Sequence, residues 1–329
     1  MSWDSSPPFE TPAQHPDLTV QPSPQVKKKK IVLHILLLLG TVVTTTGAGF
    51  FWHVGFVSQS SGEAMGRLSG ILNHPLDLLN GLPFAFTILV ILLAHEMGHY
   101  LTCRYYGIDA TLPYLIPAPP PFNPFGTFGA VIKIRSRFPD RRQLFDVGIA
   151  GPLAGFIFII PSLIVGLQLS TPFSSADPSQ GTLEFGEPLI FRLAAMAFFP
   201  GEAGAPISLH PIGWAAWFGM LATSINLLPI GQLDGGHIVY GLFGARSHRI
   251  ISYVAFGALI GISFYSWPML GYLLFALILI FIGFRHPRPS TDFPRLGRGR
   301  FLIALIGLII FVLTFMPVPV RLIQHVARL

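Results

Sequence analysis

The chain has 329 residues, of which 51% are hydrophobic and 11% are charged, whereas soluble domains carry about 25% charged residues. This composition excludes a disordered chain and most soluble folds, and it indicates a polytopic membrane protein. The net charge of +6 does not indicate nucleic-acid binding, because the basic residues lie beside apolar runs, where they act as cytoplasmic anchors. The single cysteine, Cys103, excludes an internal disulfide and a multi-cysteine metal site.

The N-terminal part of the chain is expected to anchor it in the membrane. Residues 1–30 are predicted to form a disordered, proline-rich cytoplasmic tail that ends in four lysines. The apolar run 31–52 is long enough to cross a hydrocarbon core of about 30 Å as a helix. It is too long for the apolar part of a signal peptide. We therefore assign residues 31–81 to a first transmembrane helix and an outer link.

Residues 82–245 are expected to form the core, followed by C-terminal transmembrane helices in 246–329. The further apolar runs are 82–106, 146–169, 211–228, 250–267, 269–284 and 301–316. Between the second and third helices, prolines forbid a helix and residues 130–135 alternate as in a strand. A polar, acidic loop is expected between the third and fourth helices. The predicted fold is therefore an all-α polytopic membrane protein with six or seven transmembrane helices and a re-entrant β-like hairpin.

The distribution of basic residues orients this layout. Of the 21 Lys and Arg residues, only Arg67, Arg192, Arg321 and Arg328 fall in segments predicted to lie outside. Cytoplasmic segments carry an excess of Lys and Arg, so the layout predicts a multi-pass protein of the cell (inner) membrane with a cytoplasmic N-terminus.

The second predicted helix carries the sequence His95-Glu96-Met97-Gly98-His99. Histidines four residues apart on a helix present both imidazoles on one face, where they can hold one zinc ion beside the glutamate. Ionisable groups are expensive inside a membrane, and a metal cation would compensate all three. If no metal is bound, the histidines would be hydrogen-bonded core residues and Glu96 a structural ion partner.

A catalytic zinc ion needs a third protein ligand. Cys103 lies two helical turns from His95, about 12 Å along the axis, and is better interpreted as a small buried hydrophobe. Asp234 is the better candidate, because it follows the helix-breaking Pro229 and sits in an Asp-Gly-Gly turn between apolar segments. Its alternative role is to cap a helix that begins near His237.

With such a zinc site, Glu96 would act as the base that takes a proton from water and passes it to the leaving amine. The amide of Asn226 would donate to the carbonyl oxygen or to the substrate backbone, or it would only link two helices. His210, His237 and His248 are interpreted as helix-start histidines that face the cytoplasm; the alternative for His237 is to support Asp234.

Two motifs together resemble the site-2 protease family of intramembrane zinc metalloproteases (peptidase family M50). They are His95-Glu96-x-x-His99 and, on a later helix, Asn226-x-x-Pro229 followed by Asp234-Gly235. The stretch 226–237 is most similar to the bacterial and plastid branch. The resemblance implies that His95, His99 and Asp234 bind zinc, that Glu96 is the catalytic base, and that Asn226 assists substrate binding. The predicted outer loop is too short for the PDZ domain of some members.

The predicted function is hydrolysis of peptide bonds within or near transmembrane segments, with one zinc ion per chain. Single-span membrane proteins in the lipid bilayer are the expected substrates. An extended substrate is expected to add as a strand at residues 129–134, because a helical peptide bond is shielded by its own hydrogen bonds. Two alternatives remain open: a membrane metal-ion transporter using the His and Asp residues and a mononuclear iron site. A di-iron oxygenase would need a second Glu-x-x-His pair, and the other five glutamates have no histidine three residues later.

Overall fold

The structure is a computed structural model that describes residues 28–58, 60–120, 122–172, 182–201, 206–265, 271–282, 288–293 and 295–323. Of the tail predicted for residues 1–30, residues 1–27 lie outside the described residues. Within the described part, four helices are long and apolar enough to cross a membrane: Ile31–Val57, Pro75–Tyr105, Arg141–Gln168 and Asp234–Tyr265. The chain is therefore a multi-pass, predominantly helical membrane protein.

The first helix, α1 (Lys28–Val57), is followed by the outer link, which contains α2 (Ser61–Ser69) and two short 3₁₀ helices, Gly70–Leu72 and Pro75–Gly81. α1 continues five residues beyond the predicted end. It crosses the start of α3 (Leu82–Tyr105) where two glycines meet, since a Cβ at Gly49 or Gly81 would overlap the other segment's backbone. Small residues at such a crossing let two membrane helices approach closely.

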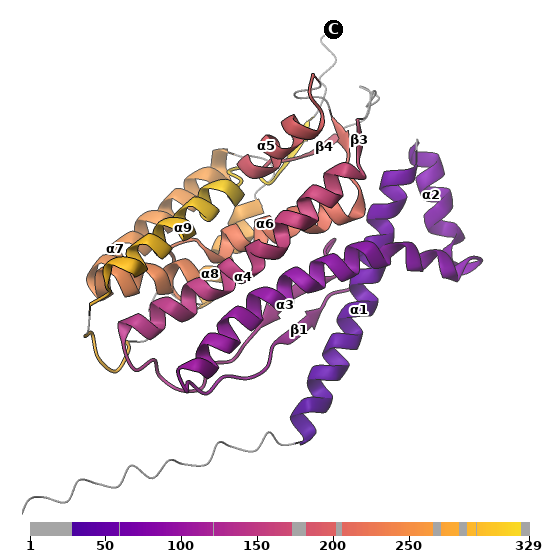
Figure 1. Cartoon of the computed structure of the whole chain (residues 1–329). Helices are drawn as coiled ribbons and strands as arrows, with labels where there is room; N and C mark the ends of the chain where they lie inside the picture. The colour runs from indigo at the N-terminus through magenta and orange to yellow at the C-terminus, as the bar shows by residue number, and fades with distance from the viewer. Residues whose placement is uncertain are drawn as a thin grey trace, which may run out of the picture.

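α3 packs along α4 (Arg141–Gln168), and the two form the centre of the bundle (Figure 1). α4 begins five residues before the predicted start at residue 146. The reason is an N-cap: the Asp140 carboxylate accepts hydrogen bonds from the backbone N–H groups of Arg142 (2.8 Å) and Gln143 (3.0 Å). The two helices approach closely at Gly98, where a Cβ would overlap the Ala150 carbonyl.

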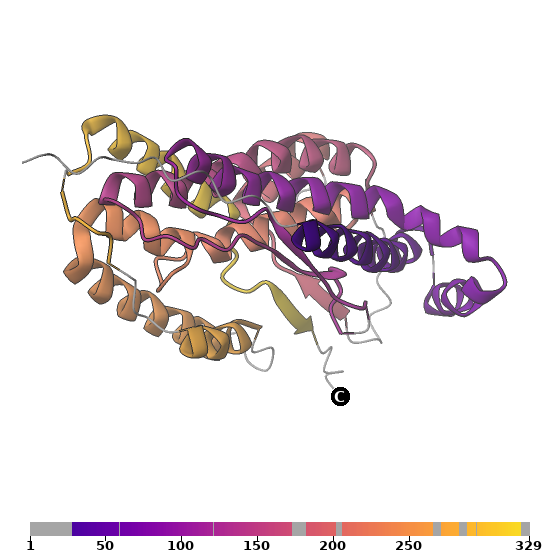
Figure 2. The same ribbon diagram turned by 90° about the horizontal axis from the view of Figure 1, so that it is seen from below.

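Two antiparallel strands lie between α3 and α4 in the sequence, β1 (Tyr114–Pro117) and β2 (Thr127–Val131). β2 begins earlier than the predicted strand 130–135. The pairing continues beyond β2 through single backbone bonds: the Thr111 N–H donates to Lys133 (3.0 Å) and the Arg135 N–H donates to Asp109 (2.8 Å). Seen from below, this strand pair runs beside α1 and α3 (Figure 2).

The segment between α4 and α6 was expected to be a loop, and this expectation is wrong. It contains the short apolar helix α5 (Leu189–Phe198) and the strands β3 (Thr171–Pro172), β4 (Thr182–Phe185) and β5 (Ile207–Ser208). β3 pairs with β5, and β4 pairs with β6 (Val320–Ile323), which follows the last helix. These elements lie at the end of the bundle where α1 ends, opposite to the end where it begins (Figure 1).

The remaining helices are α6 (Pro211–Asn226), α7 (Asp234–Tyr265), α8 (Gly271–Ile282) and α9 (Arg298–Thr314). α7 starts well before the predicted run at 250, but its helical geometry is broken at Gly244, where φ is +83°. Just before the break, the Arg141 guanidinium donates to the Gly241 carbonyl from two nitrogens, at 2.7 and 3.1 Å. α7 is therefore two helical segments joined at a glycine.

The structure tests two of the histidine predictions. His210 does begin a helix, because its Nδ1 accepts from the Ile212 N–H (3.2 Å) as the N-cap of α6. It lies beside Phe56 near the end of α1. His248 lies near the start of the second segment of α7, just after Gly244, but the expectation that it faces the cytoplasm is wrong, because it is 2% exposed.

Candidate metal centre

His95 and His99 lie one turn apart on the buried side of α3, and each residue is 6% exposed. Their Nε2 atoms are 3.1 Å apart. The spacing of four residues places both imidazoles on the same face of the helix. The structure therefore directs two metal-binding nitrogens at one point inside the bundle.

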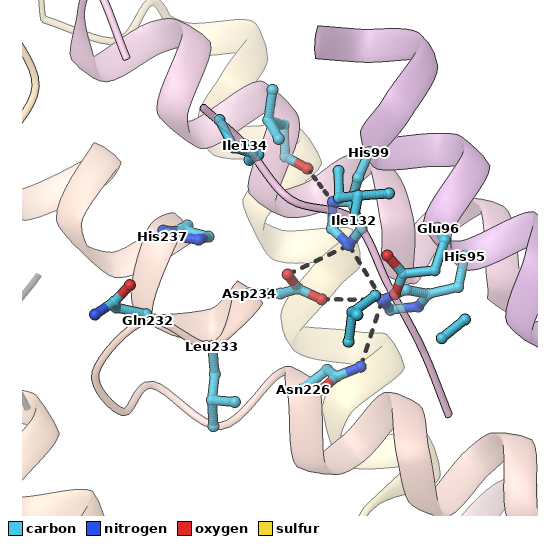
Figure 3. A pocket seen from close by; sticks show the side chains of 13 residues that line it. His95, Glu96, His99, Ile132, Ile134, Asn226, Gln232, Leu233, Asp234 and His237 are labelled. Carbon is cyan, nitrogen blue, oxygen red and sulfur yellow. Dashed lines mark hydrogen bonds and ion pairs between the residues drawn. The ribbon is translucent and has the colours of Figure 1, made fainter. Parts of the chain in front are cut away.

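Asp234 is the first residue of α7, and its carboxylate lies against both histidines (Figure 3). Its Oδ2 is 3.1 Å from His95 Nε2, and its Oδ1 is 3.3 Å from His99 Nε2. The two glycines that follow allow this placement, because a Cβ at Gly235 would overlap the Leu227 carbonyl and a Cβ at Gly236 would overlap Gly231. Residues 139 positions apart in the sequence thus meet at one site.

These three residues form a group whose ligand atoms all lie within 4.8 Å of one another. The separations of 3.1, 3.1 and 3.3 Å match the spacing of about 3.3 Å between nitrogens that bind zinc tetrahedrally at about 2.0–2.1 Å. Two imidazoles and one carboxylate are also a common donor set for catalytic zinc. The arrangement therefore fits a single metal ion.

The orientation of His99 supports this fit. Its Nδ1 lies 2.7 Å from the backbone carbonyl oxygen of Val147 on α4. A carbonyl oxygen only accepts hydrogen bonds, so Nδ1 carries a proton, and Nε2 is the ring nitrogen that remains to bind a metal beside Asp234 and His95. Metal-binding histidines are commonly oriented by such a bond from the other ring nitrogen.

The space for the two imidazoles is created by glycines on α4. A Cβ at Gly151 would overlap the His99 ring, and a Cβ at Gly155 would lie 3.2 Å from the Cβ of His95. The sequence indicated close helix contact in this stretch, but it did not reveal that the contact is with the histidines. The Val147 carbonyl was also missed, since backbone acceptors have no side-chain signal.

Glu96 lies beside the histidines and is 8% exposed. Its carboxylate accepts a hydrogen bond from the backbone N–H of Ile132, in the extended segment after β2. The amide Nδ2 of Asn226, the last residue of α6, is 3.4 Å from His95 Nε2. The structure therefore places an acidic group and an amide at the edge of the three-residue group (Figure 3).

These residues open into a pocket of about 250 Å³. Part of its wall comes from the extended segment, through Ala130, Val131, Ile132 and Ile134, and part from Gln232, Leu233 and His237 at the start of α7. Cys103 is not among the lining residues. It is fully buried against Ile108, Leu144 and neighbouring apolar residues, as expected for a small hydrophobe.

The fold and the site together define a multi-pass membrane protein with a buried His-His-Asp centre and an adjacent glutamate. The family model of peptidase family M50 matches residues 83–266. Among curated proteins, the chain is 34% identical over 258 residues to "Probable zinc metalloprotease EGY1, chloroplastic" of Arabidopsis thaliana, which covers 74% of this chain and 44% of the relative. It is 34% identical over 253 residues to the protein of the same name from Oryza sativa subsp. japonica, covering 72% and 41%.

A further relative is "Probable zinc metalloprotease EGY2, chloroplastic" of Arabidopsis thaliana, which is 32% identical over 197 residues, covering 57% of this chain and 33% of the relative. The matches thus span less than half the length of these relatives. The family match covers more than half of this chain and includes all five residues of the predicted site. The chain belongs to peptidase family M50, the site-2 protease family.

Proposed function

We propose that this chain is an intramembrane zinc metalloprotease that hydrolyses peptide bonds within or near transmembrane segments of membrane proteins. The observation that carries the proposal is the convergence of His95, His99 and Asp234 beside a buried glutamate. Membership of peptidase family M50 and the names of the relatives, which are zinc metalloproteases, support the same activity. Neither comparison supports the alternative of a metal-ion transporter.

In this proposal, the two histidines and Asp234 hold one zinc ion per chain. Zinc in such a site supplies Lewis acidity, which polarises a carbonyl group and acidifies water. Glu96 takes the proton from the attacking water and delivers it to the nitrogen of the leaving amine, acting first as base and then as acid. The pocket that adjoins these residues gives the substrate access.

Asn226 is assigned to substrate binding. Its amide lies at the same edge of the site as His95, so its N–H groups can donate to the carbonyl oxygen on which negative charge develops, or to the substrate backbone.

The substrate is proposed to bind as an added strand along residues 129–134. Val131 faces Tyr114 of β1, and Lys133 and Arg135 bond back to the segment before β1. Since successive residues of a strand direct their backbone groups to opposite edges, Ile132 and Ile134 direct theirs to the other edge, where both residues line the pocket. A single-span substrate that unwinds there would present an extended peptide bond to Glu96.

For the membrane topology, we propose seven spans, α1, α3, α4, α6, the second segment of α7, α8 and α9, with the N-terminus on the cytoplasmic side of the cell membrane. The pairing of β4 with β6 supports an odd number, because it brings the segment after α9 to the outer loop. The strand pair between α3 and α4 is then the proposed re-entrant hairpin. The domain boundaries proposed from the sequence, 31–81, 82–245 and 246–329, are retained.

The test compares the wild-type protein with Glu96→Gln in detergent or liposomes, measuring zinc content and cleavage of a model single-span substrate. We expect the variant to retain about one zinc ion per chain while cleavage falls by at least about 100-fold, because a general base is removed. Glu63→Gln is the matched control, since Glu63 is an exposed residue of α2 paired with Arg67. A wild-type protein that binds zinc, cleaves no membrane segment and moves metal across liposomes would contradict the proposal in favour of transport.

A further inference from the structure

The loop between α6 and α7, residues 227–233, connects two residues of the centre. Asn226 ends α6 before the loop, and Asp234 begins α7 after it. The loop cannot be helical throughout, since it contains Pro229 and since Gly231 has a positive φ of 55°. Leu227, Leu228 and Ile230 are all buried, so the backbone polar groups of this loop lie away from water and need partners within the protein.

Two side chains from the second segment of α7 supply those partners. His248 Nε2 donates to the Gly231 carbonyl at 2.9 Å. Ser252 Oγ donates to the Pro229 carbonyl at 3.1 Å and accepts from the Gly231 N–H at 3.3 Å. His248 is 2% exposed and Ser252 is fully buried.

The break at Gly244 explains how α7 can supply both Asp234 at the centre and the two side chains that bond to the loop. Asp234 lies in the segment of α7 before the break, and His248 and Ser252 lie in the segment after it. The second segment packs back on the loop through Leu259, which joins Leu228 and Ile230 in one apolar cluster with α8. α7 therefore supplies a centre residue at its start and the support for the preceding loop further along.

We propose that His248 and Ser252 are positioning residues that fix the loop and thereby the separation of Asn226 and Asp234 around the metal. Neither side chain is among those that line the pocket, so they act through the loop backbone and not on the substrate. Loss of either group leaves buried backbone groups of the loop without a partner, and the loop then shifts to satisfy them. This inference rests on the proposed metal-binding role of Asp234.

The experiment measures zinc affinity of the full-length protein in detergent by competition with a chromogenic chelator, with no substrate present. The variants are His248→Leu, which removes the donor, His248→Gln, which retains an N–H donor, and Ser252→Ala. Ser263→Ala is the matched control, because Ser263 is also fully buried on α7 and donates to Leu259 within its own helix (2.9 Å). The visible spectrum of the Co²⁺-substituted protein reports the ligand geometry for each variant.

We expect His248→Leu and Ser252→Ala to weaken zinc binding by about 10- to 100-fold, the usual effect of losing a group that supports a ligand, and to alter the Co²⁺ spectrum. His248→Gln should restore affinity to within about threefold of wild type. The inference is overturned if His248→Leu and Ser252→Ala hold zinc as tightly as Ser263→Ala with an unchanged spectrum. If His248→Leu does not fold, the smaller change Ser252→Ala decides.

Because the readout is zinc binding alone, it is independent of proteolysis. Weaker zinc binding in His248→Leu and Ser252→Ala would support the positioning role. If the wild-type protein at the same time cleaves no substrate, only the proposed function is contradicted. If Asp234→Asn binds zinc as tightly as wild type, Asp234 is not a zinc ligand and the positioning role is refuted, whatever the cleavage result.

Discussion

His99 of α3 is bound to α4 through its own Nδ1, which donates to the carbonyl oxygen of Val147 at 2.7 Å. This bond places a proton on Nδ1 and leaves Nε2 as the ring nitrogen that can bind a metal beside Asp234. α4 carries no residue of the predicted metal group, yet it orients one of the histidines and provides the room for it. The geometry of the metal group thus depends on three helices, although its side chains come from two, α3 and α7.

Gly151→Ala tests the contribution of α4. The added methyl would overlap the His99 ring, so the imidazole must move away from Asp234. We expect kcat/KM to fall by about 100-fold, as for a misplacement of about 1 Å, together with a loss of bound zinc. Gly257→Ala is the control, because a Cβ there has open space. Unchanged zinc content and cleavage in Gly151→Ala would show that the helices adjust without moving His99.

The proposed strand addition predicts the effect of proline in the extended segment. Ala130→Pro and Ile134→Pro each remove an N–H group from the segment that lines the pocket, and neither N–H is the one that Glu96 accepts. We expect cleavage to fall by at least about tenfold for each, because each backbone hydrogen bond to the substrate contributes to binding, while zinc content stays near one per chain. If both variants cleave normally, this segment serves only as a structural hairpin.

A third prediction concerns the stability of the contact between α4 and α9 near the end of α3. Asp146 on α4 accepts from Arg300 of α9 through both oxygens (2.8 and 2.6 Å) and from the Tyr106 hydroxyl (2.5 Å). We expect Asp146→Asn to lower the free energy of unfolding by about 2 kcal/mol, since hydrogen bonds to a charged group are lost. The change is measured by unfolding in detergent.

The matched control for this pair is Asp109→Asn. Asp109 pairs with Arg135 at 3.7 Å, and both side chains are exposed, so its loss should cost less than about 1 kcal/mol. Equal effects of the two substitutions would refute the structural importance of the Asp146 cluster.

The N-cap of α6 predicts that the stability of the protein falls at low pH. Burial, and the nearby His53, lower the pKa of His210 below its ordinary value of 6.5, and its unprotonated Nδ1 caps the helix. A lowered pKa means that folding favours the neutral ring. The contribution of His210 to the free energy of unfolding is therefore complete above pH 6.5 and is lost as the pH falls through the folded-state pKa.

The measurement is the Tm of wild type and His210→Asn between pH 7.5 and 5. Asparagine also caps a helix but does not titrate, so the wild type should lose more stability on acidification than the variant. Parallel Tm curves for the two proteins would exclude His210 as a source of the acid sensitivity.

The sequence by itself determined that the chain is a membrane protein, since long apolar runs with few charges are stable as helices that cross the lipid bilayer. It also predicted site residues that the structure brings together, because the two histidines of His95-Glu96-x-x-His99 are one helical turn apart, and because Asp234 stands after a proline in a glycine turn. Helix starts were less well predicted, since Asp140 caps α4 five residues early. The structure between α4 and α6 was missed because its strands are short and one of them, β4, pairs with the distant residues 320–323.

Only the tertiary structure decided how these residues meet. The contact between His95 and Asp234 spans 139 positions, and no local pattern encodes such a distance. The same applies to the Val147 carbonyl, which has no side-chain signal, and to His248, which was expected to face the cytoplasm but lies buried against the Gly231 carbonyl. Local periodicity predicts helices and motifs, whereas the packing of helices determines which backbone groups need a partner and which side chain supplies it.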